Sequence, residues 1–547
     1  MRKKMLSVLL TASMIMSLAA CGKTEETGGS ADTSATKTPE ATKAEATEGA
    51  KTESGSSNQT ASSDIDTSEH VVISYMTTGD KKDNGATEKV LEQLNKILTE
   101  KVNAELEIYY IGWTDYLSNY NLTLAQMDGT VDLVGTASDW LDAWPNVKNG
   151  AFLELSEDML KTYAPQTWAS VSQEHWDLCK YNGNIYLMPE DNYAQWTNHG
   201  FAYRLDWAKQ AGLSNGVHSW QDMTTYFAWV KENEPDITPW DSDGTQYAQL
   251  ASGWIASHTN YVAIDGLSTG GLWGGTKDNL YTVTCPFLTE TDSLVEFAKE
   301  MKKWDEIGVW KTDVLNNTSS DNREDFKIGK TAAEQHHTQT WTDLVSKTPQ
   351  NVPGAEVGFF YFGEETKNVV ALSITHGAMA VSAGSKNPER ALMVYDLLRN
   401  DPECYNLINY GLQGVQWDLN DEGLRIQPAS YVQADDEIVT NFWWGRNDDL
   451  EIKDATRDWN AIDSLYATYD GIKIDYPYGQ FVPDTDAIQS YINNINEIHN
   501  SYMKQIAFGK YQGTAEEIVA EYQAALKGAG IEDVMKELQT QFDALYK

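Results

Sequence analysis

Basic residues and cysteines are scarce in this sequence. Lys and Arg number 41 against 81 Asp and Glu in 547 residues, so the formal net charge is −40. A phosphate backbone would be repelled by most of such a surface, which argues against nucleic-acid binding. Four widely spaced cysteines fit neither a disulfide scaffold nor a zinc cluster. Hydrophobic residues at 41% and charged residues at 22% instead indicate a globular protein.

Long apolar runs are equally rare. Met5 to Ala20 is such a run, and it follows the basic residues Arg2, Lys3 and Lys4. A run of 16 residues is short for a membrane span and has the anatomy of a secretory signal peptide over residues 1–20. No later stretch reaches 18 uninterrupted apolar residues, so the sequence predicts no other membrane-spanning segment.

The end of the apolar run resembles the lipobox of bacterial lipoproteins. It reads Leu18-Ala19-Ala20-Cys21 and is followed by Gly22. The resemblance implies cleavage before Cys21, which would then carry the lipid; the alternative is an ordinary cleavage site with a chance cysteine. Removing residues 1–20 takes away three basic residues and changes the formal net charge from −40 to −43.

Residues 21–68 form a predicted disordered tether. They are mostly Thr, Ser, Ala, Gly, Glu and Lys, and Ile65 is the one large apolar residue after Cys21. Such a segment buries too little surface to offset its ordering entropy. As a flexible coil it would span roughly 35–40 Å, enough to hold a folded body away from a membrane.

The residues after the tether alternate between strand and helix patterns. Strands are predicted at 71–76, 106–111 and 131–135, and helices around 90–98 and 116–127. This alternation favours a parallel, helix-covered α/β sheet. Ligands of such sheets bind beyond the carboxyl ends of the strands, which makes Thr77, Trp113 and residues 136–140 site candidates by position. No glycine-rich nucleotide-binding motif and no H-E-x-x-H zinc motif occurs.

Several later segments resemble extracellular solute-binding proteins of ABC transporters. Residues 181–189 (YNGNIYLMP) resemble the crossover between lobes, residues 202–207 (AYRLDW) the next strand and helix, and residues 326–333 (FKIGKTAA) a second-lobe segment. Residues 385–391 resemble the helix after the chain returns to the first lobe. Residues 508–541 resemble the lipoprotein-type, carbohydrate-binding members with an extended C-terminal region.

This resemblance implies an α/β, two-lobed periplasmic-binding-protein-like clamp of type II, with the ligand cleft between the lobes. The first lobe would comprise residues 69–190 and 376–435, and the second lobe residues 191–375 and 436–547 with the C-terminal helices. The expected protein is a monomer, anchored by lipid to the outer face of the cell membrane of a bacterium, with a Gram-positive envelope expected. It would capture a neutral oligosaccharide by lobe closure and deliver it to the permease subunits of an ABC importer.

A sugar offers apolar C–H faces to aromatic rings and a rim of hydroxyls to polar side chains. The chain is rich in that pairing, with 19 Trp. Each Trp has the competing interpretation of a core residue, and Arg204 that of a structural ion pair. The candidate ligand-binding residues are Asp139, Trp140, Asn192, Trp196, Arg204, Trp254, Trp273, His337, Trp341, His376, Trp417, Trp443 and Arg446.

The sequence predicts no cofactor. His336 and His337 are adjacent, and neighbouring residues rarely ligate one ion together. Asp241-Ser242-Asp243-Gly244 is a fragment of a calcium loop, but an EF-hand pattern would need a carboxylate where Ser252 stands. A turn is the favoured interpretation of residues 241–244, and structural calcium stays open as the alternative.

Two other functions compete with sugar transport. A secreted glycoside hydrolase would need two carboxylates that flank one bond, whereas Glu190 and Asp191 are sequential and on a strand would face opposite sides. No G-x-S-x-G elbow occurs either, so we expect no enzyme. The second alternative is a binding protein for a peptide or another polar solute.

Overall fold

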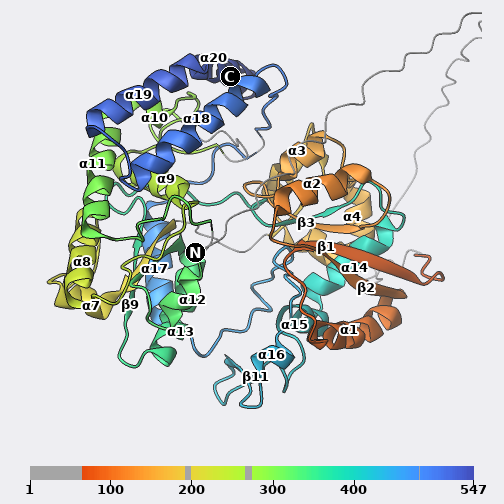
Figure 1. The fold of residues 1–547 in the computed structure, drawn as a ribbon. Helices are drawn as coiled ribbons and strands as arrows, with labels where there is room; N and C mark the ends of the chain where they lie inside the picture. The colour runs from red at the N-terminus through yellow and green to blue at the C-terminus, as the bar shows by residue number, and fades with distance from the viewer. Residues whose placement is uncertain (1–64, 191–198, 265–273, 319, 480) are drawn as a thin grey trace, which may run out of the picture. The chain divides into compact units, whose positions relative to one another are not determined.

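The computed structural model describes residues 65–190, 199–264, 274–318, 320–479 and 481–547 (Figure 1). The chain divides into two units, Met1–Ser62 and Ser63–Lys547. The first unit, with the predicted signal peptide, Cys21 and most of the tether, lies outside the described residues. No helix in the described part of the chain is both long and apolar enough to cross a membrane.

The first sheet has five strands in the order β2-β1-β3-β10-β6. Its strands are β1 (Val71–Thr78), β2 (Ala104–Ile111), β3 (Leu133–Thr136), β6 (Met188–Pro189) and β10 (Ala378–Val381). β1 is parallel to β2 and β3, as predicted, whereas β10 runs antiparallel to β3 and β6. The carboxyl ends of β1, β2 and β3 therefore meet at one edge of the sheet.

Helices cover this sheet because their apolar residues recur at helical spacing and form one buried face. In α1 (Ala86–Val102), Val90, Leu94 and Leu98 recur every four residues and are fully buried. The same core contains residues of α2 (Tyr116–Gln126), α14 (Pro388–Asn400) and α15 (Pro402–Tyr410). We call this sheet, its helices and their shared core the first lobe.

The second sheet has the order β8-β7-β9. It comprises β7 (His199–Arg204), β8 (Ala333–His337) and β9 (Val357–Tyr361), and β7 is antiparallel to both neighbours. The predicted parallel sheet concerned residues 71–135, and the sequence made no prediction of strand direction for this second sheet. β8 and β9 run the same way and are joined by α13 (Thr338–Asn351), but β7 lies between them in the opposite direction. We call this sheet with its core the second lobe.

The C-terminal helices belong to the second lobe. α18 (Gln489–Ala507) lies beside α9 (Tyr247–His258) and α11 (Thr291–Ile307), and α19 (Ala515–Gly528) also lies beside α11. α20 (Ile531–Tyr546) packs on α18 and α19 (Figure 1). Phe508, Tyr522 and Phe542 are fully buried in one core with the residues of the second sheet. α17 (Trp459–Ile472) packs against α13 and β9 through Ile462 and Tyr469.

The segment before α17 differs from the predicted boundary at residue 435. Phe442 and Trp444 are buried in the core of the first lobe. Tyr395 on α14 donates a 2.9 Å hydrogen bond to the Trp444 carbonyl, and Tyr405 on α15 donates to Glu451. Residues 436–451 therefore extend the first lobe, and the passage to the second lobe follows them.

The remaining elements surround these two cores. They are α3 (Ala143–Lys148), α4 (Glu157–Tyr163), α5 (Pro165–Ser170), α6 (Gln173–Leu178), β4 (Lys180–Tyr181), β5 (Asn184–Ile185), α7 (Leu205–Gln210), α8 (Trp220–Asn233), α9 (Tyr247–His258), α10 (Pro286–Thr289), α11 (Thr291–Ile307), α12 (Asn322–Lys327), β11 (Asp418–Leu419), β12 (Arg425–Ile426) and α16 (Gln433–Asp436).

Candidate ligand-binding site

Five aromatic rings gather at the carboxyl edge of the first sheet. Trp113 follows β2, Tyr116 begins α2, Trp140 follows β3, and Trp443 and Trp444 come from the returning segment. Trp140 stacks on Trp444 with ring centroids 5.7 Å apart and on Trp113 at 6.3 Å. Trp113 also stacks on Trp443 at 6.2 Å. We call these five residues the aromatic cluster.

The cluster has a buried base and an exposed rim. Trp444 is 1% exposed, and its indole N–H donates to Thr77 Oγ1 at 3.3 Å. A side chain at Gly135 would overlap the Trp444 ring, so the close approach of this ring requires glycine there. Trp113 is 44% exposed and Trp443 is 43% exposed. Large exposed rings on a supported base offer an apolar surface to a ligand.

Polar groups with unused hydrogen-bonding capacity lie beside the cluster. His376 Nδ1 lies 2.8 Å from Asp139 Oδ2, which joins two residues that the sequence predicted for the site. Within the described part of the chain, the buried atoms Asp139 Oδ1 and Ser138 Oγ have no hydrogen-bond partner. Buried polar atoms are nearly always paired, so these atoms are suited to the hydroxyl groups of a ligand.

Glu190 lies where the chain leaves the first lobe. It is 8% exposed, and its backbone N–H donates to the Gly377 carbonyl at 2.7 Å. Burial raises the pKa of the Glu190 carboxyl to about 7, although Arg446, His376 and Arg399 oppose that shift. Glu190 therefore titrates near neutral pH at the crossing between the lobes.

Three histidines cluster at one end of the second sheet. His199 begins β7 and pairs in register with His337 at the end of β8. The His336 ring centroid lies 4.2 Å from that of His337 and 5.6 Å from that of His199. Burial is the main cause that lowers the pKa of His199 to about 4, of His336 to about 2 and of His337 to about 3. All three rings are therefore neutral at physiological pH and present hydrogen-bonding nitrogens without charge.

Two predicted aromatic residues lie in the second-lobe core instead of at a site. Trp254 is 5% exposed, and its indole N–H donates to the Ser293 carbonyl at 3.0 Å. Trp341 is also buried and stacks on Phe359 with a centroid distance of 5.7 Å. Their packing supports the alternative interpretation, in which both are core residues.

The two predicted arginines are occupied by carboxylates. Arg204 Nε and Nη2 donate to the two oxygens of Asp206 at 2.8 and 2.7 Å. Arg446 Nε lies 3.5 Å from Glu451 and 3.7 Å from Asp448. Arg204 therefore has the structural ion pair that we weighed against a ligand role, and Arg446 sits in an acidic surrounding.

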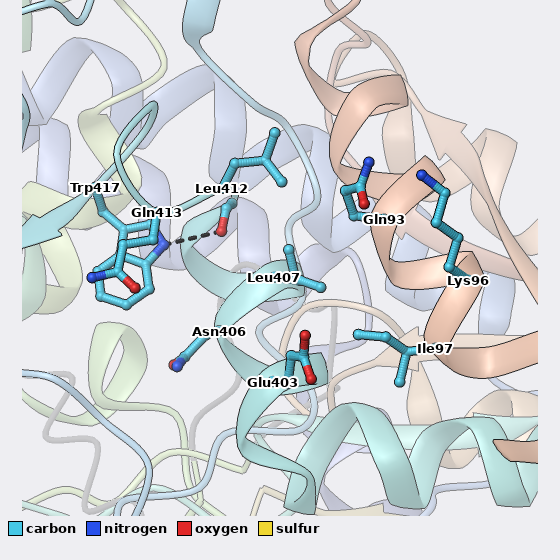
Figure 2. A pocket seen from close by; sticks show the side chains of 10 residues that line it. Gln93, Lys96, Ile97, Glu403, Asn406, Leu407, Leu412, Gln413 and Trp417 are labelled. Atoms are coloured by element: carbon cyan, nitrogen blue, oxygen red, sulfur yellow. Dashed lines mark hydrogen bonds between the residues drawn. The ribbon is translucent and has the colours of Figure 1, made fainter. Parts of the chain in front are cut away.

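Trp417 lies at a separate pocket of the first lobe, of about 480 Å³. Its indole N–H donates to the Gly411 carbonyl at 3.0 Å. Figure 2 shows Trp417 and Gln413 on one side of this pocket, with Gln93 and Lys96 of α1 on the other. The structure thus does not bring Trp417 to the aromatic cluster. Asn192, Trp196 and Trp273 lie outside the described residues.

Residues 241–244 have the contacts of a turn. Asp243 Oδ1 accepts hydrogen bonds from the N–H and the hydroxyl of Thr245 at 2.8 and 2.5 Å. Asp241 Oδ1 lies 2.7 Å from Lys311 Nζ. Among the residues that the structure describes, no group of three or more His, Cys, Asp or Glu is arranged to hold a metal ion.

Sequence reasoning missed two members of these groups. Tyr116 was interpreted only as the start of a helix, and His199 was not singled out. Tyr116 follows three residues after Trp113, just beyond a predicted strand, so its position was an available signal. His199 can be recognised as a member of the histidine cluster only from the pairing of β7 with β8, which joins residues far apart in the sequence.

The fold and the site together define a two-lobed α/β binding protein, and comparison with known families agrees. Residues 80–401 match the family described as "Bacterial extracellular solute-binding protein", and the chain belongs to that family. Residues 477–547 match a second family, described as "Domain of unknown function (DUF3502)". That match covers the C-terminal helices which complete the core of the second lobe.

One characterised relative and several solved structures are similar to this chain. A carbohydrate ABC transporter substrate-binding protein of Streptococcus pneumoniae is 25% identical over 494 residues, which cover 88% of this chain and 92% of the relative. The N-glycan transport solute-binding protein NgtS of Streptococcus pneumoniae, solved with Man1GlcNAc, is 20% identical with a TM-score of 0.64, over 87% of this chain and 99% of that one. An HMO-binding solute-binding protein of Bifidobacterium longum infantis is 17% identical with a TM-score of 0.60, over 87% and 99%. These structures share the fold.

Proposed function

We propose that this protein captures a neutral oligosaccharide for an ABC importer. Membership of the extracellular solute-binding family supports a transport receptor. The names of the relative from Streptococcus pneumoniae and of NgtS, which bind carbohydrate and N-glycan, support sugar as the solute. Within that class, the role is to hold the sugar and present it to permease subunits in the membrane, without chemical conversion.

The observation that carries this proposal is the aromatic cluster with its polar neighbours. Trp113 and Trp443 are nearly half exposed and offer aromatic surface for the C–H side of pyranose rings. Asp139 and Ser138, beside them, hold buried polar atoms that lack protein partners within the described residues. Stacking surfaces next to unsatisfied acceptors and donors match the two kinds of surface that a sugar presents.

Lobe closure supplies the second half of the site in this proposal. The Asp139 carboxylate opposes the fall that burial causes in the His199 pKa. A ligand that contacts both lobes favours the closed arrangement by its differential affinity for that state. Neutral imidazoles on one lobe and a carboxylate on the other provide both donors and acceptors for hydroxyls.

The charges around the site favour a neutral sugar over a uronate. Arg446 is surrounded by carboxylates, and Arg204, at the opposite end of β7 from His199, is paired with Asp206. The three clustered histidines are neutral. Residues 191–198 and 265–273, outside the described part, contain no Lys, Arg or His. An anionic sugar would therefore be desolvated without a compensating cation.

We further propose that Cys21 carries the lipid that holds the protein, as a monomer, on the outer face of the cell membrane. Expression in a Gram-positive host with labelled palmitate tests this proposal. The wild-type chain should take up label and remain with the membrane, whereas Cys21→Ser should be unlabelled and released. Equal release of both chains would contradict the anchor and leave the binding function untouched.

A thermal-shift screen of the protein without residues 1–68 tests the binding function. The ligands are neutral and acidic oligosaccharides, amino acids and short peptides. A ligand that binds only the folded state stabilises it by RT ln(1 + [L]/Kd), about 2.7 kcal/mol at 100 Kd. We expect a raised midpoint with a neutral glycan series and no new product by chromatography. A shift with peptides alone would overturn the sugar proposal, and product formation would overturn the proposal of binding without catalysis.

A further inference from the structure

A polar pocket of about 350 Å³ lies on the second lobe beside the histidine cluster. Its size is at the lower end of the range of about 300–1,000 Å³ that small-molecule sites occupy. Ser242 and Gln246 contribute from the turn and helix start before α9, Ser320 and Arg323 from the region of α12, and Gln335 and His336 from β8. Almost every lining side chain is polar, and the buried Trp240 forms part of the wall.

The pocket borders the histidine cluster, because two residues of its lining also contact that cluster. His336 lines the pocket, and its ring is also a member of the histidine cluster, 4.2 Å from that of His337. Gln335 lines the pocket too, and its Nε2 lies 3.1 Å from His199 Nδ1. A ligand held against His199 and His337 therefore has a polar cavity directly beside it on the same lobe.

Gln246 is the residue in this pocket that lacks a structural explanation. Its side-chain oxygen is buried and has no hydrogen-bond partner within the described part of the chain. By contrast, the amide of Asn322 is used by the fold, since it donates to the Ala333 carbonyl at 3.0 Å. An acceptor that is buried and unused costs free energy unless a ligand or water supplies the missing donor.

We propose that this pocket is an additional subsite for a neutral sugar unit, which extends the ligand beyond the units held at the aromatic cluster. The inference rests on the proposed function. The Gln246 side-chain oxygen accepts a hydrogen bond from a sugar hydroxyl, and the surrounding serines, amide and imidazole complete the polar lining. The protein accordingly prefers longer neutral oligosaccharides to disaccharides.

The charged residues of the pocket favour a neutral sugar over an anionic one. Arg323 Nε lies 3.2 Å from Glu334 Oε1, and Glu324 lies 2.9 Å from Lys327. Asp243, which accepts hydrogen bonds from Thr245, and Asp321 add two further carboxylates to the lining. An anionic sugar would be repelled by these carboxylates, whereas a neutral sugar adds hydrogen bonds without adding charge.

Isothermal titration calorimetry with ligands of two lengths tests the subsite. The probes are two pairs, Man1GlcNAc with Man5GlcNAc and maltose with maltohexaose. We expect the wild-type protein to bind the longer member of at least one pair more tightly. Gln246→Ala should weaken that longer ligand about three- to tenfold, the range for one lost hydrogen bond, and change the shorter one less than twofold.

Two further variants control this experiment. Gln249→Ala makes the same substitution on α9 outside the pocket lining, and should change neither affinity. Ser320→Phe fills the pocket with a bulky ring and should abolish the preference for length. Unfolding by urea is measured for each variant, so that a loss of fold is separated from a loss of binding.

The possible outcomes are distinct. If the wild-type protein binds sugars of both lengths and neither Gln246→Ala nor Ser320→Phe alters the length preference, the subsite is contradicted and the transport function stands. If the effect of Gln246→Ala appears only with millimolar calcium and vanishes in EDTA, a cation site replaces the sugar subsite. If no neutral oligosaccharide binds the wild-type protein in these titrations or in the screen, the proposed function fails and the subsite fails with it.

Discussion

At the scale of single residues, exposure separates the tryptophans that can meet a ligand from those that cannot. Trp113 and Trp443 are nearly half exposed at the edge of the first sheet, whereas Trp254 is buried in the second lobe. The sequence placed Trp140, Trp443, Trp254 and Trp341 in one group, because residue type and flanking residues do not report burial. Position after a strand was the better guide, since it identified Trp113 and residues 136–140.

Removing an exposed ring should weaken binding and leave the fold intact. Trp113→Ala and Trp443→Ala should each lower the affinity for a neutral oligosaccharide about tenfold or more, because a stacking surface is lost. Calorimetric titration and urea unfolding measure the two properties separately. Trp254→Ala is the contrasting variant: it should lower the free energy of unfolding by about 3–5 kcal/mol through a core cavity. A core-like loss of stability in Trp113→Ala would remove that residue from the site.

The buried carboxyl of Glu190 should make stability depend on pH in a defined direction. Burial raises the pKa of this carboxyl from 4.5 to about 7, so the folded state holds the proton more tightly than the unfolded state does. The stability that the folded state gains by holding this proton more tightly is fully present below about pH 4.5, and it is lost as pH rises through about 7. Glu190→Gln removes that titration. The variant should therefore gain stability relative to the wild-type protein between pH 5 and 8, by up to about 3 kcal/mol.

Urea denaturation at a series of pH values measures this difference. The histidines with lowered pKa change stability in the opposite sense, since they favour the folded state as pH rises towards 6.5. Comparing variant with wild type cancels their contribution, because both proteins retain all three rings. A stability difference that stays constant from pH 5 to 8 would show that Glu190 does not titrate in this range.

At the scale of secondary-structure elements, the first lobe was largely predictable and the second was not. The strands at 71–76, 106–111 and 131–135 are confirmed as β1, β2 and β3 with small changes at their ends. Each strand is followed by its own helix or turn, so the local sequence pattern is enough to predict where these strands lie. The resemblance of residues 202–207 implied a strand and a helix there, but the antiparallel pairing of β7 was not predicted, because its partners β8 and β9 lie more than a hundred residues further along the chain. The lobe assignment of residues 436–451 likewise depends on long-range packing of Phe442 and Trp444.

The packing of β3 against the aromatic cluster gives a test at this scale. A methyl group at Gly135 would overlap the Trp444 ring, so Gly135→Ala should lower the free energy of unfolding by about 1–3 kcal/mol. It should also weaken oligosaccharide binding, because Trp444 supports Trp140. Gly528→Ala near the end of α19, where nothing lies within 4 Å of the new methyl group, is the matched control. The control should be neutral or stabilising by up to about 1 kcal/mol; equal destabilisation of both variants would contradict the packing argument.

At the scale of the whole molecule, the C-terminal region is part of a lobe and not an appended domain. Helices α18, α19 and α20 share a core with the second sheet through Ile495, Phe508, Tyr522 and Phe542. The sequence predicted these helices from a family resemblance, but the burial of their apolar faces against α9 and α11 follows only from the structure. The region matched to a domain of unknown function thus has a structural role in this chain.

Deleting residues 477–547 should therefore unfold the second lobe and abolish binding. The deletion exposes the apolar surface of α9, α10 and α11 that these helices cover, and an exposed core of that size is incompatible with a stable fold. Calorimetric scanning of the shortened chain should show no transition for the second lobe. A deletion that keeps a native-like transition and oligosaccharide affinity would show that the C-terminal helices are dispensable.

The proposed site selects neutral oligosaccharides by stacking on aromatic rings and by hydrogen bonds to their hydroxyls. Titration of one protein preparation with a neutral oligosaccharide and with a uronate oligosaccharide of equal length tests this selection most directly. We expect saturable binding of the neutral sugar at one site per chain and no measurable binding of the uronate. Tighter binding of the uronate would contradict this expectation, because Arg446 would then have to leave its carboxylate neighbours to hold an anion.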